Sequence, residues 1–316
     1  MRRKLAACAL LLAGTWSGSV AAFCRTTTCD QCDQPVGECI TQGAPLYWAA
    51  RCISYNVQQD GSMWATFDQI NAAANAAFDA WQTASCPDSG AHPSIRLVNG
   101  GPVACDKHEF NDETHTYGGN ANIIMFHDNG WPEAGPGVIA LTTVSFGRTS
   151  GRIYDADIEI NGLNTISAND VVPMAAYDLQ SIITHEAGHF LGLAHATDPC
   201  LITEDSCPTM SPRYPQGSDA FRTLALDDVK GICTVYPPNR TGGSESCEPC
   251  NGFSSTCGSA EPVPGTKYVM TCGTTDPSGG CAMVVADGAR RPGREARAVF
   301  AGLVGLALFF LRRRRD

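Results

Sequence analysis

Three histidines and a glutamate fall within eleven residues, in the pattern His185-Glu186-Ala-Gly-His189-Phe-Leu-Gly192-Leu-Ala-His195. On a helix, residues four apart lie about 40° apart around the axis, so His185 and His189 are expected to point the same way. Both imidazoles can then bind one zinc ion at about 2.1 Å. Glu186 lies beside the metal, where it can take a proton from zinc-bound water and hand it to a leaving amine.

Gly192 is placed to end this helix sharply, because glycine adopts left-handed backbone angles without strain. The chain can then double back and bring His195 to the metal as the third ligand. Three protein ligands leave the fourth position for water, which is typical of catalytic rather than structural zinc sites. The alternative is a retained metal site that has lost catalysis, and the presence of Glu186, the base that hydrolysis needs, disfavours it.

This pattern resembles the metzincin metalloendopeptidases, and three further segments resemble their matrixin-like branch, which holds the matrix metalloproteases. These segments are Pro208-Thr-Met210-Ser-Pro212 for the Met-turn, 155–161 for the acidic strand before the active-site helix, and 226–236 for the closing helix. The resemblance covers about residues 46–237. It implies an α+β fold, with a mixed twisted sheet, an active-site helix and a Met-turn. It also places Met210 beneath the zinc as an apolar floor and not as a ligand.

The resemblance implies one zinc ion per chain. The histidines that bind the second, structural zinc of the family are unmatched, because the aligned positions hold Thr142, Thr143 and Tyr154. His127 and Asp128 stand near that region of the sequence.

Calcium is the additional ion that we consider. Asp155, Asp157 and Glu159 alternate along a predicted strand, so all three side chains should project from one face. Carboxylates are hard oxygen ligands, which suit Ca²⁺. The alternative is a solvated acidic edge.

The segment Ala140, Leu141, Thr142 and Thr143 lies where the family has its upper edge strand. An extended protein or peptide substrate would add to this edge as another strand, with backbone hydrogen bonds supplying much of its affinity. The alternative is an ordinary edge strand that takes no part in substrate binding.

Three helices and five strands are predicted around these residues. Segment 66–81 combines apolar residues at the 3.6-residue period with many alanines, as is typical of a helix. Asp178 is placed to cap a second helix, which carries the histidines, and two aspartates favour the start of a third at 226–235. Strands are predicted over 48–57, 94–98, 122–126, 138–146 and 153–160, and the turn sequence at 99–102 is expected to close the second of them.

The composition indicates a folded body with an acidic surface. Hydrophobic residues make up 43% of the 316, enough for a sizeable core. Removing the three basic residues of 1–22 and the eight basic and three acidic residues of 282–316 leaves 11 basic against 29 acidic residues. So acidic a body argues against binding nucleic acid and suits cation binding.

The sixteen cysteines point to an oxidising compartment. Without Cys8 and Cys281, near the two ends, fourteen remain, an even number as disulfide pairing requires. Zinc clusters at the two Cys-x-x-Cys pairs, 29–32 and 247–250, are the alternative. The irregular intervals between the cysteines and the export signal before them disfavour it.

Both ends carry segments typical of targeting signals. Residues 1–22 combine a basic start, an apolar run and small residues before the end, which predicts a secretory signal. At the other end, Cys281 precedes the apolar run 298–311 and four arginines, an order that resembles the sorting tails of myxobacterial surface proteins. Fourteen apolar residues fall short of the roughly 20 that span a bilayer, so we expect transient insertion and removal of 282–316 after export. A permanent membrane anchor is the alternative.

The predicted organisation has six parts. They are a signal peptide (1–22), a Cys-rich N-terminal segment (23–45), a matrixin-like catalytic domain (46–237), a linker (238–246), a small Cys-rich module (247–280) and the sorting tail (281–316). Segment 23–45 is too short for the inhibitory prodomain of the family and lacks its cysteine motif. We expect either an enzyme that is active once folded and oxidised, or a cover in which a thiolate of segment 23–45 occupies the open zinc position.

These features together predict a monomeric, exported or surface-attached zinc endopeptidase, in which zinc-activated water attacks the peptide bond and Glu186 acts as general base. A catalytically silent surface adhesin on the same fold is the main alternative. A narrow processing peptidase that acts on one exported partner is a further one.

Overall fold

The computed structural model describes residues 23–29, 32, 37–104, 121–131, 137–197, 207–245 and 247, and the backbone of Ala296–Ala301. The predicted signal peptide, Cys281, the rest of the predicted tail and nearly all of the predicted Cys-rich module lie outside these residues. Within them, no helix combines the length and the apolar character that crossing a bilayer needs.

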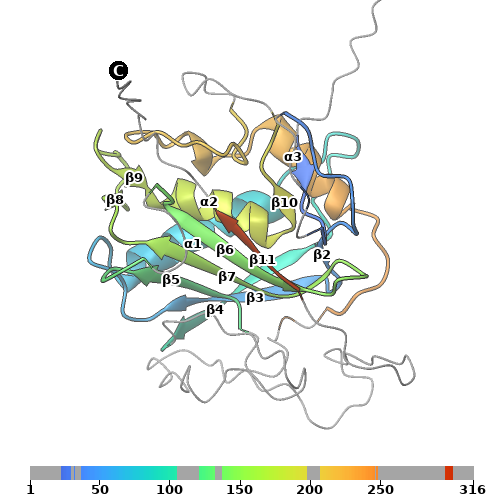
Figure 1. Cartoon of the computed structure of the whole chain (residues 1–316), viewed down its shortest axis with the longest axis horizontal. Coiled ribbons are helices and arrows are strands. Elements are labelled where there is room, and N and C mark those ends of the chain that lie inside the picture. The colour runs from blue at the N-terminus through green and yellow to red at the C-terminus, as the bar shows by residue number, and fades with distance from the viewer. Residues whose placement is uncertain are drawn as a thin grey trace, which may run out of the picture.

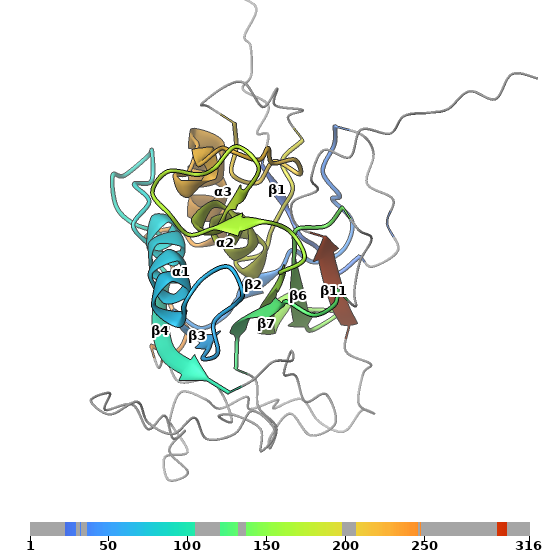
Figure 2. The ribbon, with the colours of Figure 1, turned by 90° about the vertical axis from the view of Figure 1, so that its left-hand side faces the viewer.

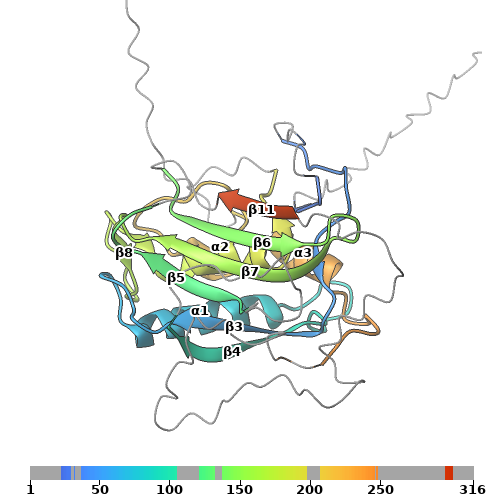
Figure 3. The same cartoon turned by 60° about the horizontal axis from the view of Figure 1, so that its bottom comes forward.

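A mixed sheet of seven strands forms the base of the molecule (Figures 1 and 3). Its strands are β2 (Tyr47–Trp48), β3 (Cys52–Gln58), β4 (Arg96–Val103), β5 (Ile123–His127), β6 (Ala140–Phe146), β7 (Arg152–Asn161) and β11 (Ala296–Ala301). The order across the sheet is β11-β6-β7-β5-β3-β4, with β2 beside β7. The pairs β3–β4, β3–β5, β5–β7 and β2–β7 are parallel, whereas β6 is antiparallel to both β7 and β11.

Two helices pack side by side against one face of this sheet (Figure 2). They are α1 (Phe67–Gln82), which connects the parallel strands β3 and β4, and α2 (Leu179–Phe190). Thr66 caps α1 in a capping box with Gln69, which explains where this helix begins. A third helix, α3 (Leu226–Val235), follows the short 3₁₀ helix η1 (Ala220–Arg222). The three predicted helices are therefore confirmed.

The core lies between the sheet and the helices. The rings of Tyr55 and Phe78 stack with centroids 4.0 Å apart, and Phe78 meets Phe190 edge-on at 5.2 Å. Trp81 is fully buried and donates its indole N–H to the carbonyl of Thr184 at 2.8 Å. This bond joins α1 directly to α2, so the core aromatics fix the position of the helix that carries the histidines.

The predicted strand 48–57 is wrong in its extent, because the chain forms two strands there, β2 and β3. β2 pairs with β7 and β3 with β4, and at the break between them the guanidinium of Arg240 donates to the carbonyls of Trp48 (2.8 Å) and Ala50 (3.0 Å). Carbonyls that accept hydrogen bonds from this side chain do not need a neighbouring strand as partner.

The expected turn at 99–102 is also wrong, because β4 runs through it to Val103. The Asn99 side chain, whose type favours turns, instead donates to Asn71 and Asn75 of α1, both at 2.7 Å. The pairing with β3 continues past an irregularity between Tyr55 and Val57.

The four cysteines of segment 23–45 form two disulfides, Cys24–Cys39 and Cys29–Cys32. A thiolate cover from this segment is therefore wrong, because all four sulfurs are bonded. The short strand β1 (Cys24–Arg25) pairs instead with β10 (Leu193–Ala194), the two residues that precede His195. Zinc clusters at the cysteine pairs 29–32 and 247–250 are not supported either, because Cys29, Cys32 and Cys247 form disulfides.

Two long-range disulfides join distant parts of the chain. Cys86, just after α1, is bonded to Cys233 of α3, and Cys52 of β3 is bonded to Cys247. Cys247 is the first cysteine of the predicted C-terminal module, so its bond ties the start of that module to the sheet.

Candidate active site

The helix α2 begins at an ion pair between a buried aspartate and a half-buried arginine. Its N-cap residue, Asp178, accepts a hydrogen bond from the backbone N–H of Ser181 at 2.9 Å, as the sequence predicts. The same carboxylate binds Arg222 of η1, with an N–O distance of 2.7 Å. The hydrogen bond from Arg222 to Asp178 raises the pKa of the guanidinium, and the contact holds η1 against α2.

The turn after α2 depends on Gly192, whose φ is 90°. A Cβ atom at this position would lie 2.6 Å from the carbonyl oxygen of Leu46, so the turn has neither the backbone angle nor the space for another residue. The chain then reverses through β10 and brings His195 back over the helix. The backbone angle and the close approach of Leu46 are those that the sequence predicts for Gly192 at a sharp turn.

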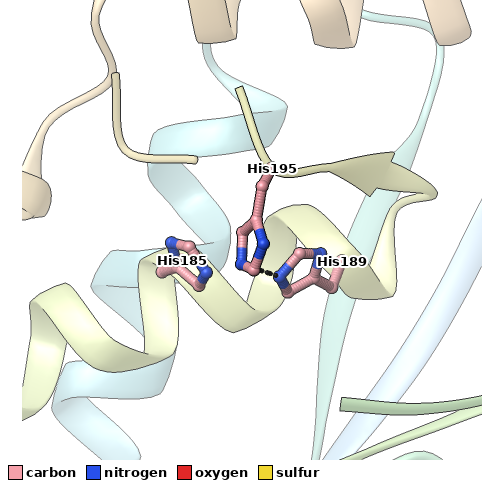
Figure 4. Close-up of side chains that lie close together, drawn as sticks. All are labelled: His185, His189 and His195. Carbon is pink, nitrogen blue, oxygen red and sulfur yellow. Dashed lines mark hydrogen bonds between the residues drawn. The ribbon is translucent and has the colours of Figure 1, made fainter. Parts of the chain in front are cut away.

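The three histidines converge on one point (Figure 4). His185 and His189 project from the same side of α2, and His195 reaches toward them from the returning chain. One ligand nitrogen from each ring lies within 4.8 Å of the other two. Within the described part of the chain, this is the only group of three metal-ligand side chains so close together.

Backbone carbonyls orient two of the rings. His185 donates from Nδ1 to the carbonyl of Thr209 at 2.6 Å, and His189 donates from Nδ1 to that of Leu193 at 2.9 Å. This tautomer leaves each Nε2 lone pair available to a metal. The buried Nε2 of His185 has no hydrogen-bond partner among the described residues. Three convergent imidazoles with an unsatisfied nitrogen fit a zinc ion.

Burial keeps these imidazoles neutral. It lowers the pKa of His185 to about 3, an effect that the neighbouring His195 strengthens and the bond to Thr209 opposes. Burial also lowers the pKa of His195 to about 4 and that of His189 well below its ordinary value. Neutral imidazole is the form that binds a metal, so the site is prepared for a cation over the physiological pH range.

Glu186 is fully buried and turned toward the sheet. Its Oε2 accepts a hydrogen bond from the hydroxyl of Thr142 in β6, at 2.6 Å. Sequence reasoning missed this contact, since it placed Thr142 on the predicted substrate edge and at a position where the family has a structural-zinc ligand. The hydroxyl fixes a carboxylate that directly follows His185 in the sequence.

Met210 packs against Gly188 of α2 and is 1% exposed, and its predicted place beneath the zinc stays a prediction. Its sulfur and methyl group fill the space beside Gly188, where a Cβ atom would come within 2.1 Å of the sulfur. Asp228 of α3 holds this segment, because its carboxylate accepts the backbone N–H groups of Thr209 (2.7 Å) and Met210 (3.1 Å). Neither Gly188 nor this role of Asp228 was predicted.

The acidic residues Asp155, Asp157 and Glu159 share one face of β7 and are at most 2% exposed. The alternative of a solvated acidic edge is therefore wrong. Glu159 lies 2.7 Å from Nε2 of His127, and Asp157 accepts the N–H of Ile123 at 2.8 Å. These contacts engage two of the three predicted calcium ligands with the protein.

The segment 140–143 forms the first half of β6, as predicted. This strand is not the outer edge of the sheet, because β11 pairs along its other side. The edge that was predicted to receive a substrate is therefore occupied by residues 296–301 of the same chain.

A three-histidine site beside a buried carboxylate, on a helix packed against a mixed sheet, is the arrangement of a zinc-dependent peptidase. Comparison with known proteins agrees: residues 91–237 match the matrixin family, Peptidase_M10. The chain is 34% identical over 133 residues to metalloendoproteinase 1 of Glycine max, a match that covers 40% of this chain. It is 31% identical over 137 residues to neutrophil collagenase of Homo sapiens, covering 41% of this chain.

The matched region spans 39% of the Glycine max protein and 26% of the human one. These matches, together with the histidine triad, support a zinc metalloendopeptidase with a metzincin fold.

Proposed function

We propose that this chain is an exported, zinc-dependent endopeptidase that hydrolyses peptide bonds of protein substrates. The observation that carries the proposal is the position of Glu186. Its carboxylate is buried, it adjoins the first of three convergent histidines, and Thr142 holds one of its oxygens at 2.6 Å. A site that only stored a metal would not need an oriented carboxylate beside the ligands.

A zinc ion bound by His185, His189 and His195 would supply Lewis-acid polarisation of the scissile carbonyl and lower the pKa of an attacking water. Glu186 accepts the proton of that water and then delivers it to the leaving amine nitrogen. Thr142 keeps the carboxylate oriented through both steps. The carbonyls of Thr209 and Leu193 hold the rings of His185 and His189 in the ligand tautomer.

Export is part of the same proposal. Four disulfides in the described residues, two of them between distant segments, suit an oxidising compartment. We propose that residues 1–22 direct export and that the segment from Cys281 onward attaches the protein transiently to the membrane or cell surface. Mass spectrometry of the surface protein tests this, because a C-terminal peptide that still carries Arg312–Asp316 would contradict removal of the tail.

A calcium ion at Asp155, Asp157 and Glu159 stays a prediction. The three carboxylates lie on one strand face, and burying them together is costly unless protons, hydrogen bonds or a cation compensate. Calcium titration followed by calorimetry and thermal unfolding tests it. An unchanged unfolding temperature at millimolar Ca²⁺ would contradict the site.

The experiment that tests the function is digestion of casein or gelatin with and without a zinc chelator. The matched control is Glu186→Ala, which keeps all three ligands. We expect zinc-dependent hydrolysis that falls by about 10²–10⁴-fold in Glu186→Ala, as loss of a general base predicts. Near one zinc per chain should remain in that variant. Zinc binding without hydrolysis of either protein or of a peptide library would favour the adhesin alternative.

A further inference from the structure

The strand β11 pairs with β6 over six residue positions, from Ala296 opposite Phe146 to Ala301 opposite Leu141. The pairing is antiparallel, and β11 lies on the side of β6 away from β7 (Figure 3). A polypeptide that extends a sheet at an open edge binds chiefly through its backbone hydrogen bonds. β11 therefore uses the same backbone groups of β6 that an added substrate strand would need.

The register brings β11 close to the catalytic carboxylate. Phe300 stands opposite Thr142, the residue whose hydroxyl binds Glu186. The pairs on either side, Val299 with Thr143 and Ala301 with Leu141, cover two more residues of the predicted substrate edge, and Ala140 lies just beyond the pairing. The covered part of β6 therefore includes the part nearest to the proposed general base.

We propose that residues 296–301 are a built-in competitor for the substrate strand, so that the full chain is self-inhibited until this segment leaves β6. The proposal rests on the function proposed above. The segment reads Ala-Arg-Ala-Val-Phe-Ala, and valine and phenylalanine favour strands. Because it is tethered, its effective concentration at β6 is on the order of millimolar, which a dilute substrate has to outcompete.

The proposal also links removal of the C-terminal segment to the activity of the peptidase. Any cleavage that removes residues beyond Cys281 also removes β11 and opens β6. Release of the tail would then activate the peptidase, and the activity would appear only after export.

The first test replaces two consecutive residues in the full-length protein, Val299→Pro with Phe300→Pro. Alternate N–H groups of an edge strand face its neighbour, so removing two in succession removes at least one that faces β6. The matched control is Ala289→Pro with Arg290→Pro, which lies outside β11. We expect kcat/KM on a fluorogenic peptide to rise about tenfold in the strand variant, as loss of a millimolar competitor that binds near 0.1 mM predicts, and to stay unchanged in the control. Equal activity in all three proteins would overturn the proposal.

The second test does not depend on hydrolysis. In the Glu186→Ala background, a fluorescent peptide with the sequence of residues 294–303 is titrated into the protein with and without the two β11 prolines. We expect at least tenfold tighter binding when the prolines free β6, together with faster hydrogen exchange at Leu141–Phe146. Equal binding and exchange would overturn the proposal whether or not the protein is a peptidase. Cleavage within 296–301 by the wild type would also overturn it, because the segment would then be a substrate and not an inhibitor.

Discussion

Glu186 and Thr142 are 44 positions apart in the sequence, yet their side chains are 2.6 Å apart. A carboxylate that must receive a proton and then release it gains from a fixed orientation, since small misplacements slow proton transfer. The hydroxyl of Thr142 supplies this orientation from the sheet. In the proposed mechanism Thr142 therefore acts through Glu186, as a positioning residue.

We predict that Thr142→Val lowers kcat by about tenfold, as loss of one hydrogen bond to a charged group implies, with little change in KM or zinc content. Valine keeps the shape and the β-branched side chain of threonine but loses the donor. Thr143→Val is the matched control, because its hydroxyl faces Glu159 on the other face of β6. Steady-state kinetics measure kcat and KM, and metal analysis measures the zinc content. An equal loss in both variants would point to a general effect on β6.

The side chain of Met210 fills the space beside Gly188, so a side chain at position 188 would overlap it. We predict that Gly188→Ala destabilises the protein by about 1–3 kcal/mol, because the added methyl group would overlap the Met210 sulfur and the Trp81 ring. Met210→Leu should cost less than about 1.5 kcal/mol and keep zinc, since the volume is conserved. Gly130→Ala, in open space, is the control for denaturant unfolding. Loss of zinc in Met210→Leu would show that the sulfur matters beyond packing.

At the scale of elements, α3 holds the segment whose carbonyl contacts His185. Its Asp228 accepts three backbone N–H groups, from Thr209, Met210 and Ala225, and so joins the start of the helix to the segment that orients His185. An asparagine has one acceptor oxygen in place of two and turns an NH₂ group toward backbone donors. We predict that Asp228→Asn costs about 1–3 kcal/mol in denaturant unfolding. Asp227→Asn, its neighbour in the same turn, should cost less.

The pH dependence of that cost follows from the pKa of Asp228. Burial raises this pKa from 3.8 to about 6, although the three backbone N–H groups favour the carboxylate. The folded chain therefore holds this proton between about pH 4 and 6, where the unfolded chain has lost it. The contribution of Asp228 to the free energy of unfolding should decline as the pH rises through this range. Asp228→Asn should lack the decline, as unfolding curves at several pH values will show.

The sequence predicts the elements of this fold better than their partners. Periodicity and caps located the three helices, and the spacing of His185, Gly192 and His195 predicted their convergence, because both depend on neighbours along the chain. The contact of Thr142 with Glu186 and the space beside Gly188 depend on how sheet and helix pack. Contacts of this kind leave no pattern in the local sequence. The turn predicted at 99–102 does not form, because the side chain of Asn99, a residue type typical of turns, donates hydrogen bonds to α1 instead.

The strand β11 shows the same limit for the whole chain. Its last four residues, 298–301, begin the apolar run that composition favours as a membrane-inserted segment, whereas the structure pairs their backbone with β6. Short apolar runs rich in valine and phenylalanine suit either environment. Whether these residues pair as a strand or enter a membrane depends on whether the edge of β6 is free to pair with them, and the local sequence does not reveal this.

Disulfides connect the elements at the scale of the whole molecule, and their value should depend on the loop that each one closes. Cys86–Cys233 closes a loop of 147 residues between α1 and α3, whereas Cys29–Cys32 spans three positions. We predict that replacing Cys86 and Cys233 with alanine lowers the free energy of unfolding by about 2–5 kcal/mol, since the unfolded chain gains the entropy of the open loop. The matched pair Cys29→Ala with Cys32→Ala should cost much less. Denaturant unfolding without reductant measures both, and the kinetics of casein digestion show whether α3 still supports the site. A similar cost for both pairs would mean that local contacts, and not loop closure, account for the effect of these bonds.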